Sequence, residues 1–95
     1  MNLQDIIKNS EKNIATKNIL QDKGSATLIQ LKKGAVLKEH QSTTKAILVL
    51  IAGKAIYEEK ERTEHLSVVS DFVHIPEHVT HKVTGIEDTL LLLIQ

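Results

Sequence analysis

The sequence predicts an all-β fold, because it breaks into short apolar stretches separated by turn residues. Nine such stretches follow one another after residue 13, at a spacing typical of a sandwich or a barrel. The connections between them are too short to hold crossover helices. The strands are therefore expected to be mainly antiparallel.

The first twelve residues have a different pattern. Leu3, Ile6 and Ile7 stand at helical spacing among polar residues, which predicts one short helix or an arm. The segment is too short to be a stable helix by itself. We therefore divide the chain into an N-terminal helix or arm, residues 1–12, and a β-domain, residues 13–95.

The β-domain is expected to contain strands at residues 14–20, 26–31, 36–38, 46–52, 54–58, 65–69, 72–75, 81–83 and 89–94. Turn residues separate these stretches, among them Gly24, Gly34, Gly53 and Pro76. The charged segment of residues 58–62 is predicted to be a solvated hairpin loop without a functional role.

Two stretches within the predicted strands, residues 46–52 and 90–94, are apolar at every position. A strand with one wet face would alternate between apolar and polar residues. Both strands must therefore be covered on both faces. The barrel interior covers one face, and we expect a second copy of the chain, in a homodimer, to cover the other; the N-terminal arm is the alternative.

The composition excludes several classes of function. Twelve basic and twelve acidic residues cancel, so we expect neither a nucleic-acid partner nor a membrane surface. Cysteine is absent, which excludes disulfides and thiolate metal sites. The chain shows no signal-peptide pattern and no apolar run long enough for a membrane helix, so a cytoplasmic location is expected.

One segment resembles a known motif. From Gly34 the chain reads GAVLKEHQSTTKAILVLIAGKA. This is similar to the first motif of the cupin superfamily, which has a glycine, five residues, His-x-His, three or four residues, Glu, six residues and a glycine. Gly34, His40 and Gly53 fall in register with it.

A second segment, SDFVHIPEHVTH, resembles the second cupin motif, with Asp71, Pro76 and His81 in register. The glycine positions of this motif hold Ser70 and His78. The resemblance implies an antiparallel jelly-roll, also called a double-stranded β-helix, forming a cupin barrel behind the short N-terminal helix or arm.

In metal-dependent cupins, three histidines and one glutamate hold a divalent metal inside the barrel. By the resemblance, His40 and His81 keep two of these positions, whereas Ser42 and Ala46 replace the others. An alanine methyl group cannot ligate, and a serine hydroxyl is a poor ligand for Zn, Ni, Mn or Fe. A metal would need a recruit, for which His74 or His78 is the candidate.

These residues leave three functions open. The first is a metal-free or weakly metal-binding module for a small molecule, with His40, Ser42, Ala46 and His81 lining its pocket. The alternative is a metal-dependent cupin enzyme of the dioxygenase, isomerase or decarboxylase type that uses His40 and His81. The third is a barrel kept for self-association. We rank the binding module first and assign no catalytic residue.

Overall fold

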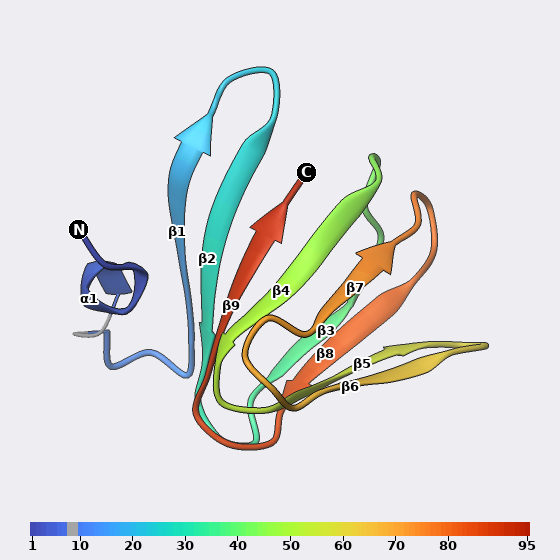
Figure 1. Ribbon diagram of the computed structural model, residues 1–95. Coiled ribbons are helices and arrows are strands. Elements are labelled where there is room, and N and C mark those ends of the chain that lie inside the picture. The colour runs from blue at the N-terminus through green and yellow to red at the C-terminus, as the bar shows by residue number, and fades with distance from the viewer. Residues whose placement is uncertain (8–9) are drawn as a thin grey trace.

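The strands form two antiparallel sheets that face each other (Figure 1). The computed structural model describes residues 1–7 and 10–95, and only the backbone of Glu39 and His40. The described elements are α1 (Leu3–Ile7), β1 (Ile14–Gln21), β2 (Ser25–Leu31), β3 (Val36–His40), β4 (Ala46–Ala52), β5 (Ala55–Glu59), β6 (Thr63–Leu66), β7 (Phe72–Ile75), β8 (His81–Gly85) and β9 (Thr89–Ile94).

One sheet has five strands in the order β1-β2-β9-β4-β7, and the other has four in the order β3-β8-β5-β6. The predicted all-β, antiparallel jelly-roll is confirmed. Its core lies between the sheets, because alternate side chains along each strand point to opposite faces. On β4, Ala46, Leu48 and Leu50 are buried against the other sheet, whereas Ile47 and Val49 lie on the outer face.

The N-terminal helix covers one end of that outer face. Ile7 of α1 is buried in a second apolar cluster with Ala15, Leu28 and Leu90. Figure 1 shows α1 beside β1. The described helix covers Leu3–Ile7, residues 10–12 are not helical, and residues 8 and 9 of the expected arm lie outside the described part of the chain. Within that part, no helix is long and apolar enough to cross a membrane.

One strand prediction is wrong. The stretch expected at residues 65–69 is displaced, since β6 ends at Leu66. The carboxylate of Asp71 accepts hydrogen bonds from the backbone N–H groups of Ser67 and Val68, each at 3.0 Å. These bonds turn the chain before residue 69, so Val68 is two-thirds exposed and does not enter the ladder.

The glycine that closes the first motif is required by close packing. Gly53 has φ +86°, and a Cβ added there would lie 2.1 Å from the carbonyl oxygen of Asp88. A side chain would therefore push the β4–β5 turn away from the start of β9. This contact fixes where the two sheets meet at the closed end of the barrel.

Candidate functional site

A row of three residues crosses the four-stranded sheet at the open end of the barrel. Strand register pairs His81 of β8 with His40 of β3 on one side and with Glu59 of β5 on the other. Residues directly opposite each other on antiparallel strands project to the same face. His81 is 3% exposed and faces the interior, so the Glu59 side chain lies on the same face. For His40 the side chain lies outside the described residues.

The His81 ring is held in one orientation by two neighbours. Its Nδ1 lies 3.1 Å from the carbonyl oxygen of Val79. Because a carbonyl only accepts, Nδ1 carries the proton of this contact. The ring also stacks on Tyr57, with the centroids 5.5 Å apart and an interplanar angle of 28°. The imidazole is therefore fixed in its orientation.

Tyr57, Glu59 and Arg62 form a hydrogen-bonded cluster next to that ring. The buried Tyr57 hydroxyl donates to Glu59 Oε2 at 2.5 Å, and Arg62 Nη2 donates to the same oxygen at 2.6 Å. The guanidinium carbon of Arg62 also lies 5.3 Å above the Tyr57 ring centroid, within cation–π range. The cluster thus places a paired carboxylate beside a buried imidazole.

Burial and hydrogen bonding set the charge states of this cluster. Burial, with the hydrogen bond to Glu59, raises the pKa of Tyr57 from 10.0 to about 12. For Glu59, burial alone would raise the pKa, but the hydrogen bonds from Tyr57 and Arg62 and the attraction of Arg62 and His81 outweigh it and lower the pKa below 4.5. At neutral pH Tyr57 is therefore a phenol and Glu59 a carboxylate.

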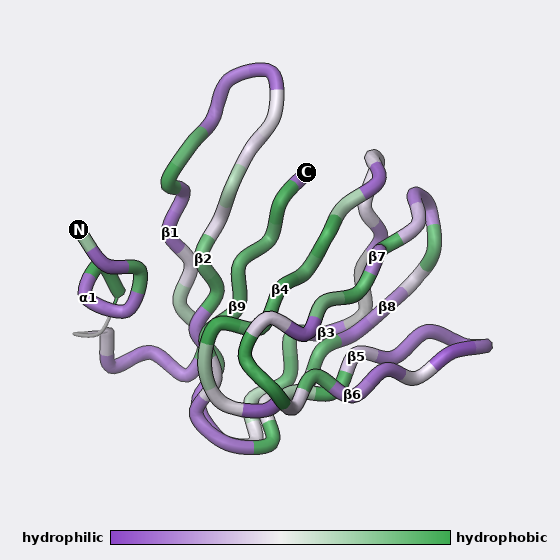
Figure 2. The backbone as a smooth tube through the Cα atoms, in the orientation of Figure 1, coloured by the Kyte–Doolittle hydropathy of each residue, from purple (hydrophilic) through white to green (hydrophobic). Residues whose placement is uncertain are grey.

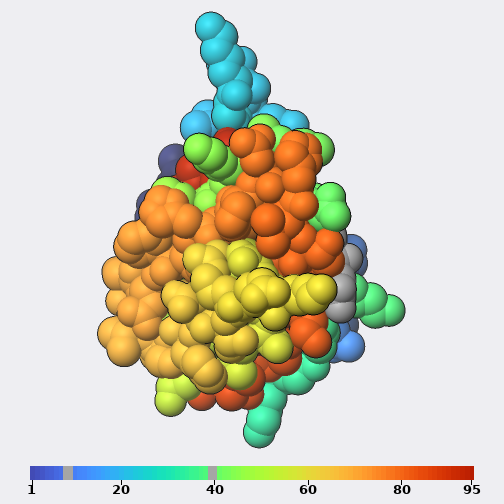
Figure 3. All heavy atoms as spheres, turned by 90° about the vertical axis from the view of Figure 1, so that its right-hand side faces the viewer, coloured from blue at the N-terminus to red at the C-terminus, as the bar shows by residue number. Residues whose placement is uncertain are grey.

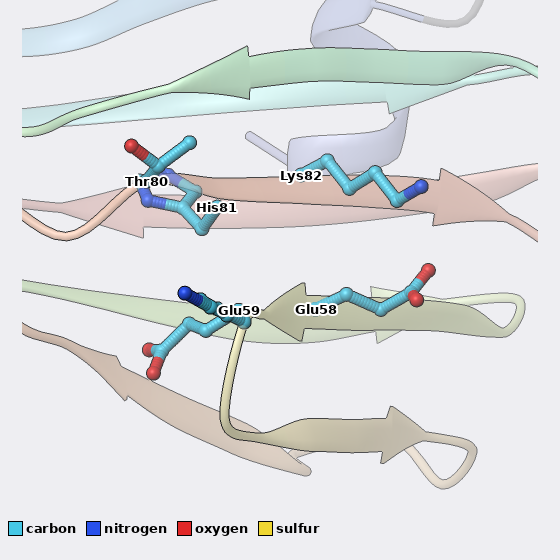
Figure 4. Close-up of a pocket in the computed structure, with 6 residues that line it drawn as sticks. Glu58, Glu59, Thr80, His81 and Lys82 are labelled. Carbon is cyan, nitrogen blue, oxygen red and sulfur yellow. The ribbon is translucent and has the colours of Figure 1, made fainter.

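His81 lines two cavities. One, of about 430 Å³, lies along the paired strands β8 and β5, and Figure 4 shows Thr80, which precedes β8, with His81 and Lys82 on β8 and Glu58 and Glu59 on the neighbouring β5. The other, of about 250 Å³, is lined by Gln41, Ser42, Thr43, Ala46, Ile75, His81, Leu93 and Gln95. The structure thus brings three of the expected pocket residues, Ser42, Ala46 and His81, to one cavity.

By the resemblance, residues 42 and 46 occupy two of the metal-ligand positions, and their side chains do not suit metal binding. Ala46 contributes a buried methyl group. The Ser42 hydroxyl lies 2.5 Å from the Thr44 carbonyl oxygen and 3.1 Å from Gln95 Oε1, so its proton is directed to protein acceptors. Ser42 also accepts at its backbone carbonyl from His78 N–H at 2.8 Å. The serine therefore shapes the loop between β3 and β4.

The structure does not bring the expected recruits to His81. His74 pairs with Ile47 on the outer face of β4 and packs edge-on against Phe72, with ring centroids 5.4 Å apart. His78 points outward in the turn after β7, with Nε2 4.0 Å from a Glu77 carboxylate oxygen and its side chain 67% exposed. Among the described residues, no three histidine, aspartate or glutamate side chains group to hold a metal ion.

Sequence analysis missed Glu59 and Arg62 as site residues, because it assigned residues 58–62 to a solvated loop. In the structure β5 continues to Glu59, and the loop is shorter than expected. A signal was present: Tyr57 is an aromatic residue in the strand predicted at residues 54–58, and a residue two positions along a strand shares its face. Glu59 should have been placed beside Tyr57 on the inner side.

Comparison with protein-family models and with curated proteins finds no match for this chain. Solved structures do match. A cupin superfamily protein from Desulfitobacterium hafniense superposes with a TM-score of 0.88, covering 98% of this chain and 85% of that one at 18% identity. KdgF from a Halomonas species superposes with a TM-score of 0.79, covering 86% and 76% at 24% identity.

The DMSP lyase DddQ from Ruegeria pomeroyi superposes with a TM-score of 0.78, covering 86% of this chain but 46% of that one, at 16% identity. These likenesses are in the fold. The chain is therefore a jelly-roll protein with a polar site at its open end. More narrowly, it is a small protein with the cupin fold, which agrees with the two motifs in its sequence.

Proposed function

We propose that this protein is a small-molecule-binding module whose ligand lies at the open end of the barrel against His81. The observation that carries the proposal is that His81 lines both cavities, buried and fixed in orientation by Val79 and Tyr57. Small-molecule sites typically combine a cavity of about 300–1,000 Å³ with a few fixed polar groups. The larger cavity, about 430 Å³, falls in the lower part of that range.

The ligand is recognised by hydrogen bonds to acceptors. His81 supplies its oriented imidazole ring, and Glu59 supplies a carboxylate that is ion-paired to Arg62. Thr80 and Lys82 add donors at the rim of the larger cavity. A compact ligand with hydroxyl or amine donors fits this arrangement, because it satisfies the buried acceptors that water otherwise solvates.

A second candidate function is that of a metal-dependent enzyme using His40 and His81. One observation favours it: Glu59 is in register with His81, as is His40, so a carboxylate stands beside the two histidine positions even though Ala46 has replaced the expected glutamate. The neighbouring Arg62 counts against it, because a guanidinium ion-paired to Glu59 repels a divalent cation.

The test compares ligand binding by three chains. A panel of small sugars, hydroxy acids and amines is screened by ligand-observed NMR against the unaltered protein, His81→Gln and the control His65→Gln, which changes an exposed histidine on β6. We expect bound compounds to be lost in His81→Gln and kept in His65→Gln. Binding that survives in His81→Gln would contradict the proposal.

The second candidate function, a metal-dependent enzyme, is tested by metal analysis. Untagged protein is assayed for bound metal, and melting temperatures are measured with Zn, Ni, Mn and Fe(II) and with a chelator. Near-stoichiometric metal, or a rise in melting temperature that Glu59→Gln abolishes and Glu58→Gln preserves, supports the enzyme. Unchanged melting with metal and chelator alike supports the metal-free module.

A further inference from the structure

The two sheets meet along a seam between their edge strands β6 and β7. β6 is an edge of the four-stranded sheet and β7 an edge of the five-stranded one, and the two strands do not pair with each other. At the closed end of the barrel, residues 67–71 join them directly. Figure 1 shows β6 and β7 diverging from that connection toward the open end. At the open end, side chains must therefore hold the seam together.

Apolar packing holds the seam only at its closed end. Leu66, the last residue of β6, is buried in the same core cluster as Val73 of β7. Two residues earlier, Glu64 pairs with the buried Tyr57 and so takes the next position on that face, but its side chain is exposed. Figure 2 shows the hairpin of β5 and β6 changing from apolar at its base to polar at its tip. β6, which the structure describes throughout, therefore gives the open half of the seam no apolar side chain.

Arg62 occupies the open half of the seam. Its guanidinium carbon lies 5.3 Å above the centroid of the Tyr57 ring, and its Nη2 donates at 2.6 Å to Glu59 Oε2 and at 2.6 Å to the carbonyl oxygen of His74 on β7. In the described part of the chain, the bond to His74 is the one hydrogen bond between residues 55–66 and β7. Figure 3 looks onto the hairpin, whose yellow atoms adjoin orange atoms of later segments. One side chain therefore links the hairpin to the opposite sheet.

The bonding of this side chain is incomplete. Arg62 Nε is buried and has no hydrogen-bond partner among the described residues. A buried donor without an acceptor costs free energy, which offsets part of what the two charge-assisted bonds of Nη2 contribute. Segments with few buried apolar contacts are those that open locally while the rest of a protein stays folded. The open half of the seam has these properties.

The candidate site lies directly behind the seam. Tyr57, which Arg62 covers, stacks on His81 with the ring centroids 5.5 Å apart. Hairpin residues 58–60 line the cavity of about 430 Å³ together with residues 80–82. Movement of the hairpin away from β7 therefore uncovers the Tyr57 ring and widens the cavity beside His81.

We propose that Arg62 is the latch of a side gate to His81. With its bond to the His74 carbonyl intact, the hairpin lies against β7 and the gate is closed; when the bond breaks, residues 60–65 move away from β7 and a small molecule passes. The latch sets how fast a ligand enters and leaves, because opening lowers the barrier in both directions. The ligand in this inference rests on the proposed function, whereas the opening itself does not.

The first test needs no ligand. Tyr57 is the single tyrosine, so its nitration by tetranitromethane reports how often the ring is uncovered. We expect Arg62→Met to nitrate about tenfold faster, which corresponds to about 1.4 kcal/mol. Methionine still covers the ring but cannot donate, so the increase reports opening. Glu61→Met, which changes the adjacent exposed residue, is the control and should nitrate at the unaltered rate.

Denaturant separates opening of the gate from unfolding of the whole chain. A local opening exposes little surface, so the nitration rate should be level at low urea concentration. A steep rise with urea would mean that Tyr57 is reached only by global unfolding, and would overturn the gate. An equal nitration rate in Arg62→Met and the unaltered protein would overturn the latch, whether or not a ligand is known. Circular dichroism checks that both variants fold.

The second test uses a compound that binds in the NMR screen. We expect Arg62→Met to raise the association and dissociation rate constants by the same factor, about tenfold, and to leave the dissociation constant unchanged, whereas Glu61→Met alters none of them. Weaker binding at an unchanged association rate would make Arg62 a binding residue and overturn its role as a latch. If no compound binds while Arg62→Met nitrates faster, the proposed function fails and the gate stands.

Discussion

Two residues in the second motif hold backbone conformations that normally belong to glycine. Ser70 has φ +83° and His78 has φ +63°, and these are the two positions where the motif carries glycine. A residue with a Cβ loses about 1–2 kcal/mol in the left-handed region. Both turns therefore have a glycine-like backbone at residues that carry a Cβ, at a cost in stability.

Restoring the glycines should stabilise the protein. We expect Ser70→Gly or His78→Gly to raise the free energy of unfolding by up to about 1 kcal/mol, because relief of backbone strain exceeds the added freedom of the unfolded chain. The melting temperature should rise by about 4–8 °C for each kcal/mol. Ser67→Gly, in the same loop but at negative φ, should destabilise by about 0.5–1 kcal/mol. If all three variants lose stability alike, the strain argument fails.

At the scale of elements, Arg62 joins the two sheets at the open end. It follows β5 in the hairpin, where its Nη2 donates to Glu59, and the same nitrogen donates to the carbonyl oxygen of His74 on β7 at 2.6 Å. The hairpin belongs to the four-stranded sheet and β7 to the five-stranded one. The charged residues at this turn therefore tie the sheets together beside the site.

The Tyr57 phenol should give the protein a stability loss at alkaline pH. Because its pKa is raised from 10.0 to about 12 in the fold, the unfolded chain releases the proton first as the pH rises. The free energy of unfolding should be level below pH 10 and fall by about 2–3 kcal/mol between pH 10 and 12. Urea unfolding measures this loss.

Tyr57→Phe is the control, since it removes the titrating group and should flatten the alkaline limb. Tyr57 is the single tyrosine and tryptophan is absent, so phenolate absorbance reports its pKa directly. A midpoint near 10 in the folded protein would contradict the predicted burial of this hydroxyl.

At acid pH the sign of the effect is opposite. Because the pKa of Glu59 is lowered in the fold, this residue stabilises the folded protein at pH values above the pKa of the unfolded chain, and this contribution is lost as the pH falls.

At the scale of the whole molecule, the last strand holds the five-stranded sheet together. β9 lies between β2 and β4, and its residues Leu90 and Leu91 are buried on opposite faces. The β1–β2 hairpin is joined to the rest of its sheet through β9 alone among the described ladders. Folding therefore depends on contacts between the two ends of the sequence.

A chain that ends at Asp88 should not fold, because the sheet divides and both buried faces of β9 are lost. We expect it to show no native circular dichroism and to be digested rapidly by protease. Removal of residues 1–12 is the comparison: it should leave a folded barrel that is weakened by about 2–5 kcal/mol, since Ile7 is lost from the outer cluster. Native structure in the chain ending at Asp88 would contradict this role for β9.

The sequence by itself determined the positions of most strands, their antiparallel pairing and the cupin fold. The strands and their antiparallel arrangement follow from local patterns, namely the alternation of apolar residues and turn residues such as Gly53, which the structure holds at φ +86°, whereas the cupin fold was implied by the resemblance to two family motifs. The apolar pattern predicted a strand at residues 65–69 that the structure does not contain. The backbone N–H groups of Ser67 and Val68 donate to the Asp71 carboxylate instead of to a neighbouring strand.

Only the tertiary structure decided what surrounds His81. The register of β5 against β8 sets Glu59 opposite His81, and Arg62 reaches the cluster through a contact with β7. The tertiary structure also places His74 against Phe72 on the outer face and His78 in an exposed turn, so neither residue reaches the interior. The physical reason is that register between strands distant in sequence is set by packing across the core, whereas local periodicity specifies only which residues of one strand share a face.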